Sequence, residues 1–147
     1  MLYFAYGSNL NHKQMKIRCE DATFIKKFNL KGYNLCFSHK TQNSIYGHAN
    51  IIKSKNLFVP GVIWKISKND EDELDYYEGV SYNYYFKKYF KLNGKKVLLY
   101  IQKKYYRKKP NSTYLHTIIQ GYKDCNLDFD YLRKRISKYE INYKIYW

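Results

Sequence analysis

Short apolar or alternating runs mark six predicted strands in this chain, separated by turn-forming residues. They cover residues 2–6, 24–37, 49–52, 58–66, 84–92 and 96–101. Gly32 predicts a turn within the second run. Pro60-Gly61 predicts a bulge or an edge within the fourth, because proline cannot donate to a sheet ladder. Asn93-Gly94 predicts a tight hairpin between the last two runs, since both residues tolerate positive φ.

Helical spacing of apolar residues marks four further segments. The predicted helices lie in residues 11–19, 69–78, 114–122 and 127–136. Asn69 is the expected N-cap of the second, whose first turn is acidic as the helix dipole favours, and Gly79 follows its end. Together these elements predict one domain over residues 1–147, a curled sheet or barrel with helices packed outside.

Composition narrows the class of protein. The chain has 147 residues, of which 45% are hydrophobic, enough for a real core. No apolar run approaches the ~20 residues of a membrane span, and no secretory signal precedes the first strand. The three cysteines lack C-x-x-C spacing and the four histidines lack metal-ligand spacing. We therefore expect a cytoplasmic protein with no membrane association and no metal.

The net charge of +15 raises the possibility of nucleic-acid binding, but its distribution argues against a specific site. The lysines are scattered along the whole chain, and no single arm or helix concentrates them. Such a surface attracts anions and nucleic acid without sequence preference. Charge alone does not separate an enzyme that acts on an acidic substrate from a protein that binds nucleotides.

Two segments carry candidate chemistry. The first strand stops abruptly at Gly7-Ser8-Asn9, where successive backbone N–H groups in a tight turn can hold a carboxylate; the alternative is an ordinary strand-to-helix turn. Further on, Glu78 is flanked by aromatic residues and ends an acidic helix. An apolar setting raises the proton affinity of a carboxylate, as a general acid or base requires. The alternative for Glu78 is an ordinary surface carboxylate.

Together these segments resemble the γ-glutamylcyclotransferase family. The resemblance runs in order from about residue 2 to residue 136 and rests on four blocks. These are residues 3–10 (Tyr-Phe-Ala-Tyr-Gly-Ser-Asn-Leu), 61–66 (Gly-Val-Ile-Trp-Lys-Ile), 74–85 (with Leu-Asp, Glu-Gly-Val and Tyr) and 121–127 (with Asn-Leu). A single block of this kind is weak evidence, whereas four in sequence are specific.

The resemblance implies an α+β fold, a small mixed β-barrel with flanking helices, and an enzyme that needs no cofactor. Its substrate is a γ-glutamyl amine or γ-glutamyl amino acid, which is converted to 5-oxoproline and the free amine. Glu78 corresponds to the catalytic glutamate of the family. The implied substrate-binding residues are Tyr6, Gly7, Ser8, Asn9, Leu10, Tyr85, Tyr100 and Tyr114.

Two departures from the family pattern leave the released amine open. Tyr76 stands where some relatives have a second acidic residue, and residues 37–47 do not match cleanly. The competing hypothesis is a binding protein on the same fold that captures an anionic small molecule such as a nucleotide. Retention of Glu78 favours the enzyme, because a phosphate-binding site gains nothing from a buried carboxylate. We expect a monomer or homodimer.

Overall fold

The computed structural model describes residues 1–139, so residues 140–147 of the predicted domain lie outside the described part. The strands are β1 (Leu2–Ala5), β2 (Thr23–His39), β3 (His48–Lys65), β4 (Phe86–Leu92), β5 (Lys95–Ile101) and β6 (Tyr106–Arg107). The α-helices are α1 (His12–Arg18), α2 (Lys68–Tyr77), α3 (Ser112–Asp124) and α4 (Phe129–Ile136). Two single turns of 3-10 helix are η1 (Ser8–Leu10) and η2 (Val80–Tyr82).

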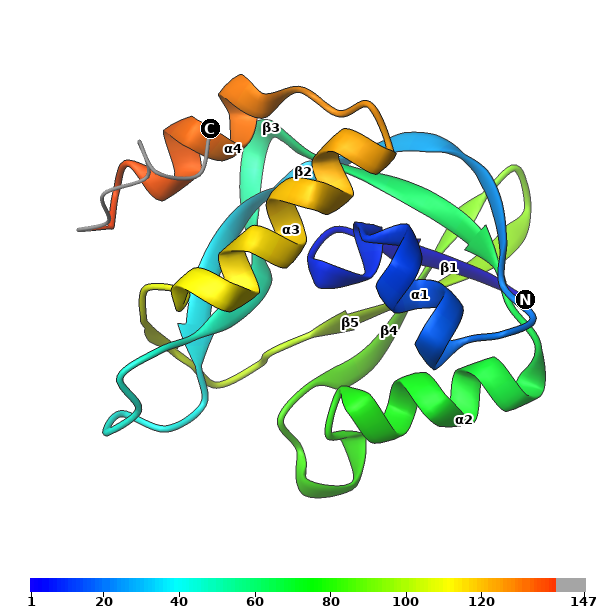
Figure 1. The fold of residues 1–147 in the computed structure, drawn as a ribbon, viewed down its shortest axis with the longest axis horizontal. Coiled ribbons are helices and arrows are strands. Elements are labelled where there is room, and N and C mark those ends of the chain that lie inside the picture. The colour runs from blue at the N-terminus through cyan, green and yellow to red at the C-terminus, as the bar shows by residue number, and fades with distance from the viewer. Residues whose placement is uncertain (140–147) are drawn as a thin grey trace.

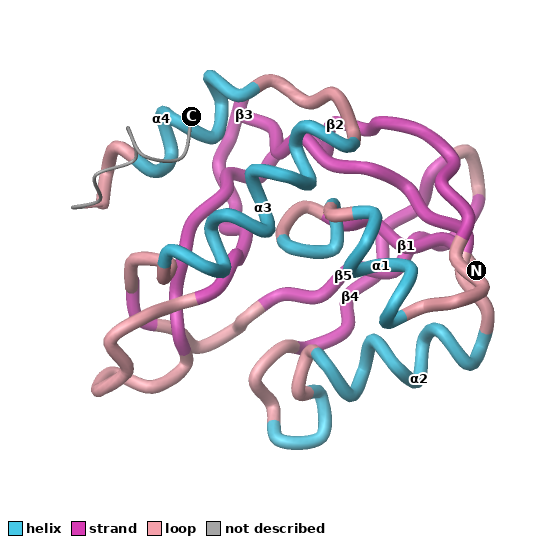
Figure 2. The backbone as a smooth tube through the Cα atoms, viewed as in Figure 1, coloured by secondary structure: helices cyan, strands magenta, loops and turns pink. Residues whose placement is uncertain are grey.

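The strands form one mixed sheet in the order β4-β5-β1-β3-β2-β6. β1 runs parallel to β5, and the other neighbouring pairs are antiparallel. The sheet curls into a half-barrel, with α1 and α3 over one side of it and α2 beside α1 (Figures 1 and 2). This confirms the predicted α+β class and its barrel-like sheet with flanking helices.

The long β2–β3 ribbon corrects two sequence predictions. Gly32 does not end a strand: it has φ +84° and sits at a shift in register within β2. Opposite it, Lys53 pairs with Tyr33 and Phe58 pairs with Lys31, so residues 54–57 bulge out of a single strand β3. The polar gap between the two predicted strands is therefore a bulge, because the partner strand continues past it.

The local structure at Pro60-Gly61 agrees only in part with the predicted bulge or edge. Pro60 pairs with Asn29 on β2, and the register shifts lie elsewhere, so the predicted bulge at this dipeptide is wrong. Pairing of β3 with β1 begins at Val62, which leaves Pro60 where its missing N–H breaks no bond to β1. A Cβ on Gly61 would clash with the Ala5 carbonyl oxygen, which explains the glycine.

The structure confirms the predicted turn at the hairpin but not the predicted N-cap of α2. Asn93 and Gly94 have φ of 51° and 78°, which confirms the tight turn between β4 and β5. The N-cap of α2 is Ser67 rather than the predicted Asn69. The Ser67 hydroxyl accepts from the Asp70 N–H, and the Asp70 carboxylate accepts from the Ser67 N–H, a reciprocal capping box.

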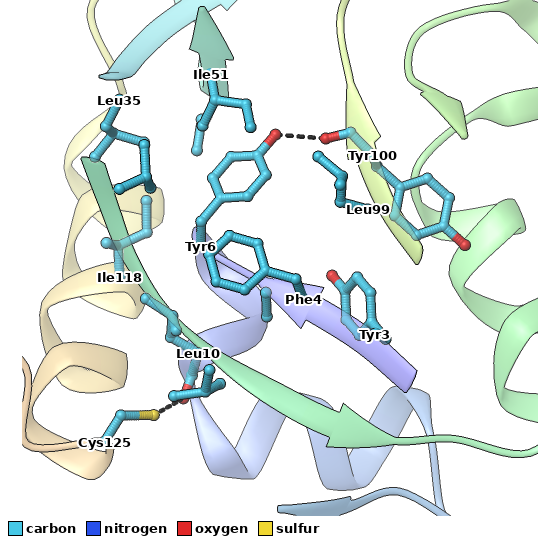
Figure 3. Close-up of a cluster of buried hydrophobic side chains, with 14 of the residues drawn as sticks. Tyr3, Phe4, Tyr6, Leu10, Leu35, Ile51, Leu99, Tyr100, Ile118 and Cys125 are labelled. Atoms are coloured by element: carbon cyan, nitrogen blue, oxygen red, sulfur yellow. Dashed lines mark hydrogen bonds between the residues drawn. The ribbon is translucent and has the colours of Figure 1, made fainter. Parts of the chain in front are cut away.

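The core lies between the curled sheet and the helices on its side. Leu10 and Cys125 join the loop after β1 to the end of α3, since the Cys125 thiol donates to the Leu10 carbonyl at 3.2 Å (Figure 3). A Cβ on Gly121 of α3 would lie 2.6 Å from Leu10 Cβ, so the glycine permits this close packing. The packing fixes the N-terminal loop against α3. No helix within residues 1–139 is long and apolar enough to cross a membrane.

Candidate functional site

One cavity of about 230 Å³ brings the two candidate segments together. Its walls come from the loop after β1, helix α1, the end of α2, the start of β3, the segment before β4 and helix α3. Every predicted site residue except Leu10 lines this cavity. Leu10 lies next to the loop with its side chain fully buried in the core, so its place is structural.

The N-terminal loop is held tightly on the cavity wall. Leu10 N–H donates to the Gly7 carbonyl and Asn11 N–H to the Ser8 carbonyl, which closes the turn η1. The N–H groups at the start of such a turn have no partner within it. A Cβ on Gly7 would lie 2.9 Å from Ala49 Cβ, so the loop approaches β3 more closely than other residues allow.

Glu78 stands at the end of α2, where the chain turns into the cavity wall. Its N–H closes the last helical turn on the Leu74 carbonyl, and Gly79 then adopts φ +65°. This left-handed glycine ends the helix and sends the chain back. The Glu78 carbonyl then accepts from Tyr85 N–H. The glutamate is thus fixed between two segments that both line the cavity.

The side chain of Glu78 meets the N-terminal loop. Asn9 Nδ2 donates to Glu78 Oε1 at 3.3 Å and to Tyr3 Oη at 3.0 Å. Burial raises the pKa of Glu78 to about 7, although the nearby Arg18 guanidinium and the Asn9 bond act in the opposite direction. A carboxyl with a pKa near neutrality can both accept and return a proton at physiological pH.

Two residues of α1, which sequence analysis did not single out, orient this contact. Arg18 Nη1 and Gln14 Nε2 both donate to Asn9 Oδ1, at 3.1 and 3.0 Å. With its oxygen so occupied, the Asn9 amide presents its nitrogen to Glu78. Arg18 also stacks over the Tyr77 ring at 4.4 Å. The i, i+4 spacing of residues 14 and 18 on one helix face was the available signal.

The predicted tyrosines build the wall more than they offer free hydroxyls. Tyr6 Oη donates to the Tyr100 carbonyl, while the Tyr100 ring points away and its hydroxyl donates to Asp75 Oδ1 at 2.7 Å (Figure 3). Tyr85 Oη donates to the Ala49 carbonyl. Buried tyrosines with hydroxyls committed in this way present ring faces to a ligand.

Tyr114 of α3 lines the cavity beside the N-terminal loop and β3. Its hydroxyl accepts from Ala49 N–H at 2.9 Å and would lie 3.6 Å from a Cβ on Gly7. Burial and the nearby Glu78 charge raise the pKa of Tyr114, which keeps its proton. The retained O–H can therefore donate to an oxygen in the cavity.

Comparison with known proteins identifies the family. The chain matches the model of the AIG2-like family over residues 58–134. It is 32% identical to human gamma-glutamylcyclotransferase over 142 residues, which cover 90% of this chain and 76% of the human protein. The chain belongs to the γ-glutamylcyclotransferase (AIG2-like) family. The bovine gamma-glutamylcyclotransferase is also 32% identical, over 97% of this chain and 81% of that protein.

Two solved structures share the fold of this chain. A structure named gamma-glutamyl cyclotransferase superposes with a TM-score of 0.81 at 30% identity, over 97% of this chain and 90% of that chain. YkqA from Bacillus subtilis superposes with a TM-score of 0.76 at 20% identity, over 93% of this chain and 54% of its own. The second likeness shows the fold alone.

The cavity has no evident metal-binding group. Within residues 1–139, no three side chains of His, Cys, Asp or Glu converge as metal ligands. The residues present instead offer one carboxyl, one guanidinium, amides, phenols and an imidazole. This donor set suits proton transfer and the recognition of a small polar molecule.

Proposed function

We propose that this chain converts a γ-glutamyl amine or γ-glutamyl amino acid to 5-oxoproline and the free amine. The observation that carries the proposal is Glu78, a carboxyl of raised pKa that meets the loop residue Asn9 inside an aromatic cavity. Membership of the γ-glutamylcyclotransferase family supports the same reaction.

The proposed reaction is an intramolecular transfer. The Glu78 carboxylate takes a proton from the substrate α-ammonium, and the freed amine attacks the γ-carbonyl carbon. A C–N bond forms, which closes the five-membered ring and leaves a tetrahedral oxyanion. Protonated Glu78 then gives its proton to the departing nitrogen, the oxyanion re-forms the carbonyl, and the original γ-amide C–N bond breaks. The extra proton on the ring nitrogen passes through Glu78 to the released amine, which leaves as an ammonium ion. The carboxyl returns to its starting state, so no co-reactant is consumed.

The contribution of the cavity is mainly orientation. The nucleophile and the electrophile belong to one molecule, and holding them in a ring-forming geometry contributes up to ~7–11 kcal/mol. We assign the backbone N–H groups of Gly7, Ser8 and Asn9 to the substrate α-carboxylate. The Tyr114 hydroxyl, which keeps its proton, is placed to donate to the developing oxyanion.

The test is 5-oxoproline release from a panel of γ-glutamyl dipeptides, glutathione and γ-glutamyl-ε-lysine. The proposal expects turnover of at least one of them by the wild-type protein and its loss in Glu78→Gln. Binding of the same compounds is measured in parallel by calorimetry. A folded wild type that binds γ-glutamyl compounds without cyclising them would support the alternative, a binding protein for small anions on the same fold.

A further inference from the structure

A second cavity lies at the edge of the sheet where the described chain begins. In Figure 1 the N-terminus, the end of β3 and the β4–β5 hairpin turn meet at this edge. The edge cavity, whose lining includes Leu2, Ile63, Leu92 and four lysines, has a volume of about 600 Å³. Among residues 1–139, none lines both the edge cavity and the cavity that holds Glu78. Small-molecule sites of ~300–1,000 Å³ are common at the mouths of barrel-like sheets.

The inner part of the edge cavity is apolar because of the way the strands alternate. Leu2 and Phe4 share one face of β1, and Phe4 lies opposite Ile63 on β3. Leu92 and Phe90 likewise share one face of β4. The rings of Phe4 and Phe90 meet edge-on, with their centroids 6.1 Å apart. They therefore lie one step deeper than Leu2 and Leu92 and form the inner end of the cavity.

Three lysines from distant segments point to the same face as this apolar floor. Each is the direct cross-strand partner of a floor residue: Lys65 of Leu2, Lys95 of Leu92 and Lys26 of Ile63. Direct partners in a sheet ladder share a face. The register shift between Phe24 and Lys26 is a bulge of the kind that redirects a side chain. Lysines that are scattered in the sequence thus form one rim, which Lys96 extends.

No carboxylate offsets the charge of this rim. Within the described residues, no Asp or Glu lines the edge cavity. The ion pairs formed between residues 1 and 139 have Lys68, Lys87 and Arg133 as their cations, and none has a rim lysine. Lysine stems cover apolar surface while their ammonium groups stay in water. The edge cavity therefore combines an apolar floor with a cationic rim.

We propose that the edge cavity binds an amphipathic anion, with its apolar tail on the floor and its anionic headgroup among Lys26, Lys65 and Lys95. The uncompensated rim determines the sign of the headgroup. Ile63 is fully buried yet lines the cavity, so the floor is recessed and takes the tail of one free molecule rather than a membrane surface. This binding site is separate from the proposed cyclisation and does not depend on it.

The test is calorimetric binding of three probes, decanoate, butyrate and 1-decanol. Decanoate should bind at least tenfold more tightly than butyrate, which lacks most of the apolar tail. It should also bind at least tenfold more tightly than 1-decanol, which lacks the charge. The affinity for decanoate should fall as the salt concentration rises, because the rim is exposed to solvent.

A triple variant tests the rim directly. Lys26→Gln, Lys65→Gln and Lys95→Gln together remove three charges and should weaken decanoate binding at least tenfold. The matched control makes the same change in net charge at three exposed lysines outside the edge cavity, Lys53→Gln, Lys91→Gln and Lys123→Gln. It should bind decanoate within about twofold of the wild type. If the triple variant does not fold, the three single variants replace it, each expected to weaken binding by about twofold or more.

Three results would overturn the inference. The first is equal affinity of the wild type for all three probes, and the second is unchanged decanoate affinity in the folded rim variants. The third is binding to phosphatidylglycerol vesicles without binding of decanoate below its micelle concentration, since the rim would then recognise a membrane surface. Tight decanoate binding that the rim variants lose and the control variant keeps would support it.

Discussion

Two glutamates seven residues apart, one within α2 and one at its end, have opposite protonation behaviour. In the first turn, Glu71 Oε2 lies 2.5 Å from Lys87 Nζ, and Glu71 Oε1 lies 3.3 Å from Lys68 Nζ. The Lys87 ammonium holds the pKa of Glu71 below its usual value. Glu78 caps the other end of the helix, and burial raises its pKa to about 7.

The surroundings at each end of α2 explain the direction of the pKa shift of the glutamate there. The first turn carries the positive end of the helix dipole, which stabilises a carboxylate, and lysines neutralise it further. At the last turn the dipole disfavours negative charge, and the Tyr-rich cavity removes water from Glu78. Arg18 and Asn9 offset this only in part. Identical side chains therefore have pKa values shifted in opposite directions at the two ends of one helix.

The comparison predicts its largest difference in catalysis. Glu78→Gln keeps the size of the side chain and removes the proton acceptor, so 5-oxoproline release should fall by ~10²-fold or more. Substrate binding should change little, because we assign the glutamyl end to the loop backbone rather than to Glu78. Glu71→Gln is the matched control and should keep near-normal turnover with a lower unfolding temperature. Full turnover by folded Glu78→Gln would remove this residue from the mechanism.

Stability should also respond to pH in opposite directions at the two sites. The folded-state pKa of Glu78, about 7, exceeds its ordinary value of 4.5. Its contribution to the free energy of unfolding is therefore fully present below pH 4.5 and is lost as pH rises to about 7. The folded-state pKa of Glu71 is lowered, so its contribution is present above the ordinary value and is lost as pH falls through the folded pKa.

Urea unfolding of the wild type and of each Gln variant, between pH 4 and pH 8, measures these contributions. Subtracting the Glu78→Gln curve from the wild type should give a difference that declines with rising pH by about 3 kcal/mol at most. The free energy of unfolding of the wild type minus that of Glu71→Gln should increase with pH in the acidic part of this range. Two subtractions with the same slope would contradict the comparison.

Arg18 offers a smaller test of the same electrostatics. Its guanidinium lowers the pKa of Glu78, so Arg18→Met should raise that pKa and move the acid limb of kcat/KM upward by about 0.5–1 pH unit. Activity near pH 6.5 should fall several-fold and recover above pH 8. Lys16→Met, an exposed lysine on the same helix, controls for net charge. If kcat/KM of Arg18→Met falls equally at every pH, Arg18 does not act on the pKa of Glu78 and only holds the Asn9 side chain.

Sequence analysis predicted the elements that carry their own local signal. The Asn93-Gly94 hairpin was correct because both residues directly favour the turn. The convergence of Glu78 with the Gly7–Asn9 loop followed from the family resemblance rather than from periodicity, since sixty-nine residues separate Asn9 from Glu78. Long-range contacts of this kind leave no local pattern in a single sequence.

The errors in the β2–β3 ribbon come from tertiary context. Gly32 and residues 54–57 carry turn-forming chemistry, yet ribbon pairing converts both into a bulge. His48 was missed as a site residue because a lone histidine has no signature of its own, and Arg18 was missed because its i, i+4 spacing from Gln14 was not used. The expected N-cap at Asn69 was misplaced by two residues, because Ser67 has the better partner in Asp70.

Substitution of the N-cap of α2 has the smallest predicted effect of the changes to this helix. Ser67→Ala removes the acceptor for Asp70 N–H and should lower the free energy of unfolding by about 1 kcal/mol. Asn69→Ala, at the residue first expected to cap, should change it by less, because no cap bond involves that side chain. Turnover should stay near normal in both, since Glu78 is fixed by Gly79 and Asn9 at the far end of α2. Chemical unfolding and 5-oxoproline release, measured on both variants, test whether the first turn of α2 affects activity at the cavity. A fall in turnover that follows the loss of stability would show that the first turn and the cavity are coupled.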